Sequence, residues 1–304
     1  MAQALGERVL GSAAARSTWM SPTALIGMVG AVGLAATTLL TGCGSGAEGP
    51  NADAPATAPA TAPATPGPGE YLPGLHASVD LPAGDPTVVV VLVPGGGWSS
   101  ADPGGLAPLA AHLTDNGLAV VTITYGTSGT DAYYPRPVDD VACAVAYAAE
   151  QVPDVPVVLV GHSAGAQLVA LAGLVPVRDD ATCPYQPRPA DGVVGLAGPY
   201  DVTQTGGLAE NLFGVPESED PELWRDGNPL TWTAERPEVP FLLVHGEDDR
   251  DVPMRFTDSF AAALTDGGHD VTVEKLPGVT HMSVFTPEVV GDLLVAWITA
   301  KLPS

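Results

Sequence analysis

The 304-residue chain is 45% hydrophobic and carries 35 acidic side chains against 11 lysines and arginines, which is enough apolar material for a globular domain with a substantial core. Its formal net charge of −24 disfavours partners that are themselves anionic, such as nucleic acids and acidic membrane surfaces. The sequence contains no CxxC pair and no HExxH helix, so no motif in it requires a metal or another cofactor.

Residues 1–42 are predicted to be a lipoprotein signal peptide. Arg8 and Arg16 precede a small and apolar run, 24–40, that is short for a membrane span. The run ends in Leu40-Thr41-Gly42-Cys43, which resembles the lipobox of bacterial lipoproteins. The resemblance implies cleavage before Cys43, lipidation of its sulfur and an extracytoplasmic protein anchored to the bacterial cell membrane through that lipid. A conventional signal peptide and an uncleaved anchor are the alternatives, and both also place the chain outside the cytoplasm.

Residues 43–70 are predicted to form a linker between the lipidated cysteine and a folded domain. Alanine, proline and threonine dominate this stretch in repeated Ala-Thr-Ala-Pro and Pro-Ala-Thr steps, a composition that cannot build a core. Prolines favour extended backbone, so at about 3.1 Å per residue the linker can reach up to about 80 Å. The folded domain is therefore expected at 71–304.

The domain alternates apolar, strand-like runs with helix-like stretches. Strands are expected at 87–93, 118–125, 156–161, 192–198, 240–245 and 271–276, with a possible antiparallel edge strand at 74–81. Helices are expected at 108–116, 137–151, 163–174, 253–264 and 287–302. This alternation is typical of βαβ units, and it predicts a twisted, mostly parallel sheet with helices on both faces. Ligands of such sheets bind beyond the carboxyl ends of the strands, so the residues that follow each strand are the functional candidates.

The strand at 156–161 is followed by a sharp turn and a helix. Ser163 lies between Gly161 and Gly165, in the G-x-S-x-G pattern of a nucleophile elbow. The glycines remove Cβ atoms that would collide in so tight a turn. The serine hydroxyl is then exposed at the end of the strand, and the Ala164 amide at the helix N-terminus points toward whatever the serine attacks. Taken alone, the pentapeptide also suits an ordinary turn with an N-capping serine.

Three other strand ends carry suggestive residues. The strand at 87–93 is followed by Pro94-Gly95-Gly96-Gly97-Trp98, whose glycine amides can approach a ligand as an oxyanion hole requires. A flexible turn is the alternative. The strand at 240–245 is followed by three carboxylates that compete to orient an imidazole, Asp248, Asp249 and Asp251. His281 follows the last strand, where a general base would reach Ser163. His162 and His245 are interpreted as packing or loop-shaping residues.

The chain order of serine, acid and histidine, each after its own strand, is that of α/β-hydrolases. Further matching segments are Leu196-Ala197-Gly198-Pro199-Tyr200-Asp201, Asn228-Pro229-Leu230-Thr231 and His245-Gly246-Glu247-Asp248-Asp249. With these, residues 72–302 resemble the esterase branch of that superfamily, which includes hormone-sensitive-lipase-like, feruloyl-esterase-like (BD-FAE) and kynurenine-formamidase-like enzymes. Pro94 departs from the family, which commonly has histidine there, and this departure bears on how the neighbouring amides are aimed.

The resemblance implies the α/β-hydrolase fold and a serine hydrolase that cleaves carboxylic esters through an acyl-enzyme. Its His-Gly-x-x-Asp pattern selects Asp249, so the implied triad is Ser163, Asp249 and His281. The amides of Gly96, Gly97 and Ala164 are the implied oxyanion hole. The expected partner is a small-molecule ester, with no cofactor, no metal and no nucleic acid, and the sequence leaves the oligomeric state open. An amidase or peptidase with the same triad and a noncatalytic surface-binding lipoprotein are the alternatives.

Residues 199–238 connect two predicted strands with more chain than the roughly 12 residues that a crossover requires. The segment carries Phe213, Trp224 and Trp232. A cap insertion over the substrate pocket and an aromatic-packed connection account for it equally well.

The remaining cysteines predict a disulfide. With Cys43 assigned to lipid, Cys143 and Cys183 are left as a single pair in an oxidising compartment. Cys143 falls on the helix before the elbow strand and Cys183 follows the elbow helix, so neighbouring elements can bring the two sulfurs together.

Overall fold

The computed structural model describes residues 67, 69–176 and 182–302, all of which belong to one compact unit, residues 60–304. The predicted signal peptide, Cys43 and nearly all of the predicted linker lie outside the described residues. None of the described helices is both long and apolar enough to cross a membrane.

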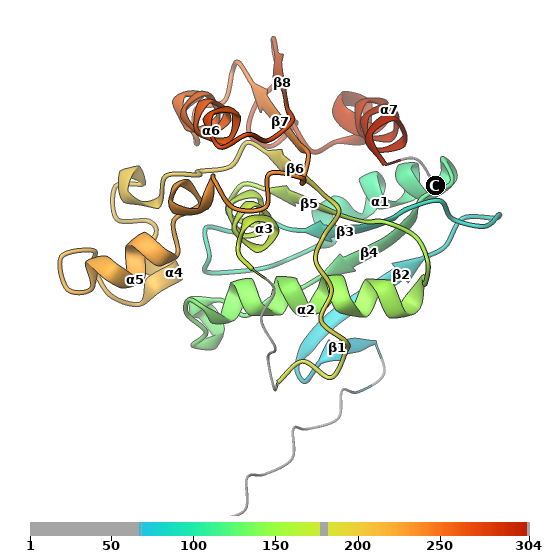
Figure 1. Ribbon diagram of the computed structural model, residues 1–304, viewed down its shortest axis with the longest axis horizontal. Helices are drawn as coiled ribbons and strands as arrows, with labels where there is room; N and C mark the ends of the chain where they lie inside the picture. The colour runs from blue at the N-terminus through green and yellow to red at the C-terminus, as the bar shows by residue number, and fades with distance from the viewer. Residues whose placement is uncertain (1–66, 68, 177–181, 303–304) are drawn as a thin grey trace, which may run out of the picture. The chain divides into compact units, whose positions relative to one another are not determined.

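An eight-stranded sheet in the order β1-β2-β4-β3-β5-β6-β7-β8 forms the centre of the domain (Figure 1). The strands are β1 (Glu70–Leu72), β2 (Leu75–Asp80), β3 (Val89–Val93), β4 (Ala119–Ile123), β5 (Val157–His162), β6 (Gly192–Leu196), β7 (Phe241–Gly246) and β8 (Val271–Leu276). β2 pairs antiparallel with β1 and β4, and every other pair is parallel. Each predicted strand is present with ends shifted by at most two residues, and the α/β-hydrolase fold is confirmed.

The pattern of burial explains why the central strands read as continuous apolar runs. Every residue of β3, β4, β5, β6 and β7 is buried, because helices cover both faces of the sheet. The outer strand β2 instead alternates partly buried and exposed positions. A continuous apolar run therefore identifies the central strands, and alternation identifies β2. The prediction that 74–81 is an edge strand was wrong, because the short strand β1 pairs with the outer side of β2.

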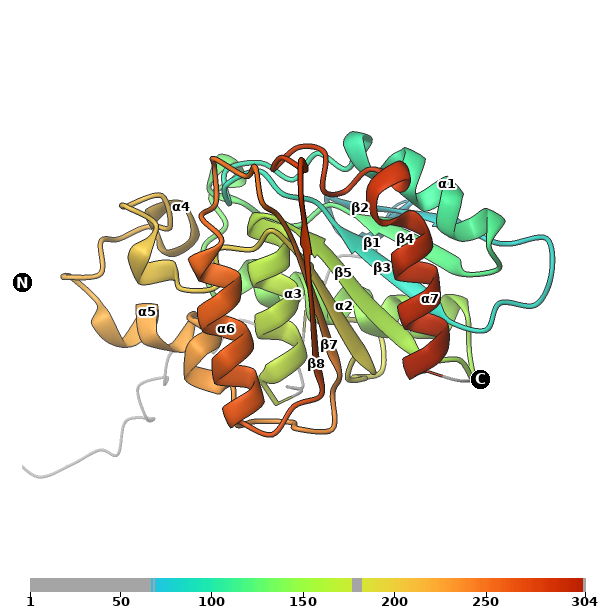
Figure 2. The same cartoon turned by 90° about the horizontal axis from the view of Figure 1, so that it is seen from above.

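Helices form two layers on the sheet (Figure 2). One face carries α1 (Ala107–Asp115) and α7 (Asp292–Lys301), and the other carries α2 (Arg136–Gln151), α3 (Ala164–Leu174) and α6 (Arg255–Asp266). Each layer has its own core. Leu109 and Leu294 pack with one face of the central strands, whereas Leu168 and Phe260 pack with the opposite face. A short π-helical segment, Pro287–Gly291, leads directly into α7, so the helix predicted at 287–302 is present with a π-helical first part.

The long connection between β6 and β7 carries the short helices α4 (Glu210–Phe213) and α5 (Pro221–Asp226). Phe213 and Trp224 are each 3% exposed, and their rings stack with centroids 4.5 Å apart. Trp232 is partly buried against the same core. These aromatic rings therefore pack within the connection, and a cap insertion at 199–238 stays a prediction.

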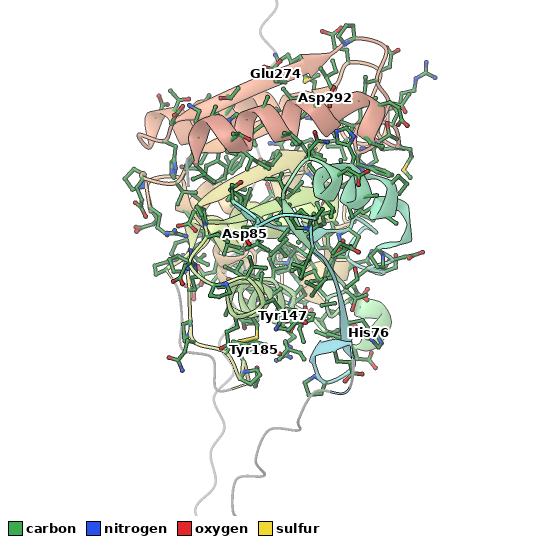
Figure 3. The ribbon with its side chains drawn as sticks, turned by 90° about the vertical axis from the view of Figure 1, so that its right-hand side faces the viewer. His76, Asp85, Tyr147, Tyr185, Glu274 and Asp292 are labelled. Atoms are coloured by element: carbon green, nitrogen blue, oxygen red, sulfur yellow. A yellow bond between two sulfur atoms is a disulfide. The ribbon has the colours of Figure 1, made fainter. Side chains whose placement is uncertain are left out.

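Cys143 and Cys183 form the predicted disulfide, with Cα atoms 5.6 Å apart. The bond joins α2 to the segment that follows α3, close to Tyr147 and Tyr185 (Figure 3). It closes a loop of 40 residues.

We expect reduction of this disulfide to lower the free energy of unfolding by about 4 kcal/mol, because the cross-link removes loop-closure entropy from the unfolded chain. Urea unfolding of the same protein with and without a phosphine reductant measures the difference without leaving a cavity at either cysteine. Two free thiols in the denatured, unreduced protein would contradict the disulfide itself.

Candidate active site

The turn between β5 and α3 has the strained backbone that the G-x-S-x-G pattern predicts. Ser163 has φ 54° and ψ −121°, a conformation that residues with a Cβ rarely adopt. A Cβ on Gly161 would lie 2.3 Å from the Gly165 carbonyl oxygen, and one on Gly165 would lie 2.5 Å from the carbonyl oxygens of Val93 and Pro94. Both glycines are therefore required by close backbone approach, as the sequence pattern predicts.

Ser163, His281 and Asp249 form a continuous hydrogen-bonded chain. The Ser163 Oγ lies 2.9 Å from His281 Nε2, and His281 Nδ1 lies 2.7 Å from Asp249 Oδ2. Because an ionised carboxylate only accepts, Nδ1 carries the proton and Nε2 is the acceptor for the serine hydroxyl. The residues follow β5, β8 and β7 respectively. The arrangement holds a base against an alcohol and a carboxylate against that base.

Asp249 is the acid that faces the imidazole. Its side chain is 1% exposed, whereas Asp248 and Asp251 are exposed. The second carboxylate oxygen, Oδ1, accepts from the amides of Asp251 and Val252 at 2.9 and 2.8 Å. These bonds fix the carboxylate and satisfy the oxygen that does not meet His281.

His245 supports this carboxylate from inside the domain. It is 0% exposed. Its Nδ1 lies 2.7 Å from the Thr257 hydroxyl, and its Nε2 lies 2.9 Å from the Val252 carbonyl oxygen and 3.4 Å from Asp249 Oδ2. Burial lowers the pKa of His245, so the ring is neutral, and its single proton sits on Nε2 because a carbonyl can only accept. His245 thus holds the turn that carries Asp249.

His162 supports the loop that carries His281. Its Nε2–H donates to the His281 carbonyl oxygen at 3.0 Å, and its ring contacts those of His281 and Phe285 at centroid distances of 4.7 and 4.5 Å. Burial, and secondarily the charge of His281, lower the pKa of His162 to about 4. It is therefore neutral near pH 7. The contacts of His162 and His245 agree with their interpretation as packing or loop-shaping residues.

The glycine loop that precedes α1 is anchored at several points. The Tyr125 hydroxyl donates to the Pro94 carbonyl oxygen at 3.0 Å, and Trp98 Nε1 donates to Gln167 Oε1 at 3.0 Å. A Cβ on Gly96, where φ is 141°, would lie 2.2 Å from the Ser100 carbonyl oxygen. Pro94 takes part in this anchoring through its carbonyl group. The N–H that a proline lacks is therefore not needed for these contacts.

The anchored loop leaves amide donors beside the serine. Within residues 67, 69–176 and 182–302, the amides of Gly96, Gly97 and Ala164 donate to no protein acceptor. All three residues line hollows that adjoin Ser163. Unpaired donors at such a place are suited to binding an oxygen of a ligand.

Two hollows flank Ser163. The α1-side hollow, of about 480 Å³, is bounded by Leu106, Met282 and Phe285 together with the glycine loop. The α6-side hollow, of about 120 Å³, is lined by Ala164, Pro199, Gln204, Thr205, Leu208, Asp251, Val252, Arg255 and Phe256 among others. Leu208 and Met282 are unusually exposed for apolar side chains, at 52% and 63%. The long β6–β7 connection therefore reaches the site through residues 199–208, while its aromatic rings lie elsewhere.

Asp249, Asp251 and His281 each place one potential metal-ligating atom within 4.8 Å of the other two. A cation there would compete for the Nδ1 that donates to Asp249. The arrangement fits proton transfer better than metal binding.

Comparison with known proteins agrees with this geometry. The BD-FAE family model matches residues 79–264, which is more than half of the chain and includes the glycine loop, Ser163 and Asp249. The chain belongs to the BD-FAE family. This membership confirms the resemblance to esterase-branch α/β-hydrolases, while His281 falls outside the matched part of this BD-FAE chain.

Relatives of this BD-FAE chain include two esterases of Mycobacterium tuberculosis (strain ATCC 25618 / H37Rv). It is 31% identical to esterase LipQ over 236 residues, covering 71% of this chain and 55% of LipQ. It is 30% identical to esterase LipC over 222 residues, covering 66% of this chain and 54% of LipC. The chain thus spans about half the length of the curated relatives it matches.

Solved structures share the fold at lower identity. A truncated form of a carbohydrate esterase from gut microbiota has a TM-score of 0.65 and 21% identity, with 74% of this chain and 90% of that chain covered. Thermogutta terrifontis esterase 2, phosphoramylated by tabun, has a TM-score of 0.60 and 20% identity, with coverage of 76% and 91%.

Proposed function

We propose that this protein is a carboxylic ester hydrolase that works through an acyl-enzyme on Ser163. The observation that carries the proposal is the chain of hydrogen bonds from the Ser163 hydroxyl through His281 to Asp249. The esterase names of LipQ and LipC support the same reaction class.

In the first half of the reaction, His281 Nε2 takes the proton of Ser163 as Oγ attacks the ester carbonyl carbon. The carbonyl oxygen becomes an oxyanion, which the free amides of Gly96, Gly97 and Ala164 stabilise. Loss of one such donor typically costs about 3 kcal/mol of transition-state stabilisation. The tetrahedral intermediate then collapses, and the alcohol leaves with the proton that His281 holds.

In the second half, water attacks the acyl-enzyme and gives its proton to His281 Nε2. Breakdown of this second intermediate releases the carboxylic acid and returns the proton to Ser163. Asp249 keeps Nδ1 protonated throughout and stabilises the imidazolium that forms in each half. His245 and His162 act by holding the acid and base loops.

The test is a panel of 4-nitrophenyl esters of graded acyl length, run in parallel with the matched 4-nitroanilides. The proposal predicts turnover of the esters and far slower turnover of the anilides. Preferential anilide cleavage would favour an amidase, and a folded protein that hydrolyses nothing in the panel would favour the noncatalytic alternative.

We also propose that the mature protein is anchored to the outer face of the cell membrane by a lipid on Cys43. The support is the lipobox-like Leu40-Thr41-Gly42-Cys43 followed by the proline-rich linker. Mass spectrometry of the membrane fraction should find Cys43 as a diacylglyceryl-modified N-terminus. An exported protein that still begins at Met1 would contradict this proposal.

A further inference from the structure

We propose that Arg255 selects esters that carry a free carboxylate, and that it binds this carboxylate in the α6-side hollow. The inference rests on the proposed ester hydrolase function, because it names the chemistry of a substrate for that same site.

Arg255 differs from most other cations of this acidic chain in having no carboxylate partner among the residues that the structure describes. In the described part of the chain, most lysines and arginines form an ion pair with a carboxylate, namely Arg136, Arg188, Arg225, Arg236, Lys275 and Lys301. Among the described residues, Arg250 and Arg255 form none. With a net charge of −24, carboxylates are plentiful, so an arginine without one is the exception. Arg255 is the member of this pair that lines a hollow next to Ser163.

The guanidinium group of Arg255 is held by an aromatic ring. The Arg255 Cζ lies 4.9 Å from the centroid of the Phe256 ring, and Phe256 is only 5% exposed and lines the same hollow. A cation–π contact restrains the guanidinium without using its N–H donors. The planar fork thus stays available for a bidentate acceptor, and a carboxylate is the acceptor whose geometry matches it.

Two uncharged polar side chains of this hollow already have hydrogen-bond partners. Gln204 Nε2 donates to Asp201 Oδ2 at 2.5 Å, and the Thr205 hydroxyl donates to the Val202 carbonyl oxygen at 2.8 Å. Asp251 also lines the hollow, within 4.8 Å of the ligating atoms of Asp249 and His281, and it does not pair with Arg255. The negative charge of the hollow, on Asp251, therefore lies near His281, and its positive charge, on Arg255, lies on α6.

The described residues that line the α1-side hollow include no lysine or arginine. Its acidic residue, Asp102, accepts from the Gly104 amide through Oδ1, and its other ionisable residues are His162 and His281. A substrate with one charged end is therefore placed in one direction, with its ester at Ser163 and its carboxylate toward α6. Esters of dicarboxylic acids and acylated hydroxy acids are the two chemical forms that fit.

The test compares charged and neutral esters of the same length. The acyl-side pair is the 4-nitrophenyl monoester of adipic acid against 4-nitrophenyl hexanoate. The alcohol-side pair is 4-acetoxybenzoate against its methyl ester. The ratio of kcat/KM for the charged ester to that for the neutral ester is measured for the wild type, for Arg255→Gln and for Arg250→Gln, at low and high salt.

We expect Arg255→Gln to lower this ratio about tenfold or more for at least one pair, as loss of a hydrogen bond to a charged group typically does. The wild-type ratio for that pair should also fall as salt rises. Arg250 also lacks an ion pair among the described residues, but it does not line the hollow. Arg250→Gln should therefore leave the ratio unchanged.

An Arg255→Gln ratio equal to that of the wild type for both pairs, or an equal effect of Arg250→Gln, would overturn the inference while leaving the ester hydrolase proposal in place. A wild-type protein that hydrolyses neither the neutral nor the charged esters would overturn both this inference and the ester hydrolase proposal.

Discussion

Replacing Ser163 by alanine is expected to lower ester turnover by at least about 10⁴-fold and to leave the fold intact. The hydroxyl is the group that His281 Nε2 meets at 2.9 Å, so its removal leaves the imidazole without the alcohol that it would activate. Alanine keeps the Cβ of serine, so the strained backbone at φ 54° is neither relieved nor made worse. Steady-state kinetics measure the loss, and thermal unfolding followed by circular dichroism checks the fold.

Ser78→Ala is the matched control. Ser78 lies at an exposed position of β2, so its replacement should leave both activity and stability as they are. Retention of more than about one hundredth of the activity by Ser163→Ala would contradict the assignment of the nucleophile.

The second large effect is expected for Asp249→Asn, which should lower kcat by about 10⁴-fold with little loss of stability. Oδ1 of Asp249 accepts two amide hydrogens, from Asp251 and Val252. The asparagine carbonyl oxygen will keep those bonds, and this turns the NH₂ group toward His281. A donor there forces Nδ1 to accept, which moves the ring proton to Nε2. Nε2 can then no longer take the proton of Ser163.

Asp248→Asn is the matched control for this substitution. Asp248 is exposed, and its backbone amide donates a hydrogen bond to the Val279 carbonyl oxygen. Its side chain makes no contribution to the chain of bonds at the site, so kcat should change less than about threefold. If Asp248→Asn is instead the crippling change and Asp249→Asn is not, the acid has been assigned one residue too late.

Much of this architecture could be predicted from the sequence because parallel strands and the elbow leave strong local patterns. β3, with the sequence Val-Val-Val-Leu-Val, is buried along its whole length, so hydrophobicity alone identifies it. Gly161 and Gly165 lie where the backbone approaches so closely that a Cβ atom would collide with it. The choice of Asp249 among three neighbouring carboxylates came from family resemblance, since local sequence gives no reason to prefer it.

The features that the sequence did not predict depend on tertiary contacts. β1 is only three residues long, too short for a periodic signal. Phe213 and Trp224 would suit a cap and a packed connection equally well, so the sequence could not predict that their rings stack and are buried. Arg255 looks like an ordinary helix residue until the ion pairs of the remaining cations are known.

The most direct test of the account is covalent labelling of the wild-type protein with a fluorophosphonate. An unassisted serine hydroxyl reacts negligibly with such a probe near neutral pH, so labelling reports the base and the oxyanion donors acting together. Intact-protein mass spectrometry should show one phosphonyl group per chain, and peptide mapping should place it on Ser163. A folded wild-type protein that remains unlabelled, or one labelled at a different residue, would contradict the assignment of Ser163 as the activated nucleophile.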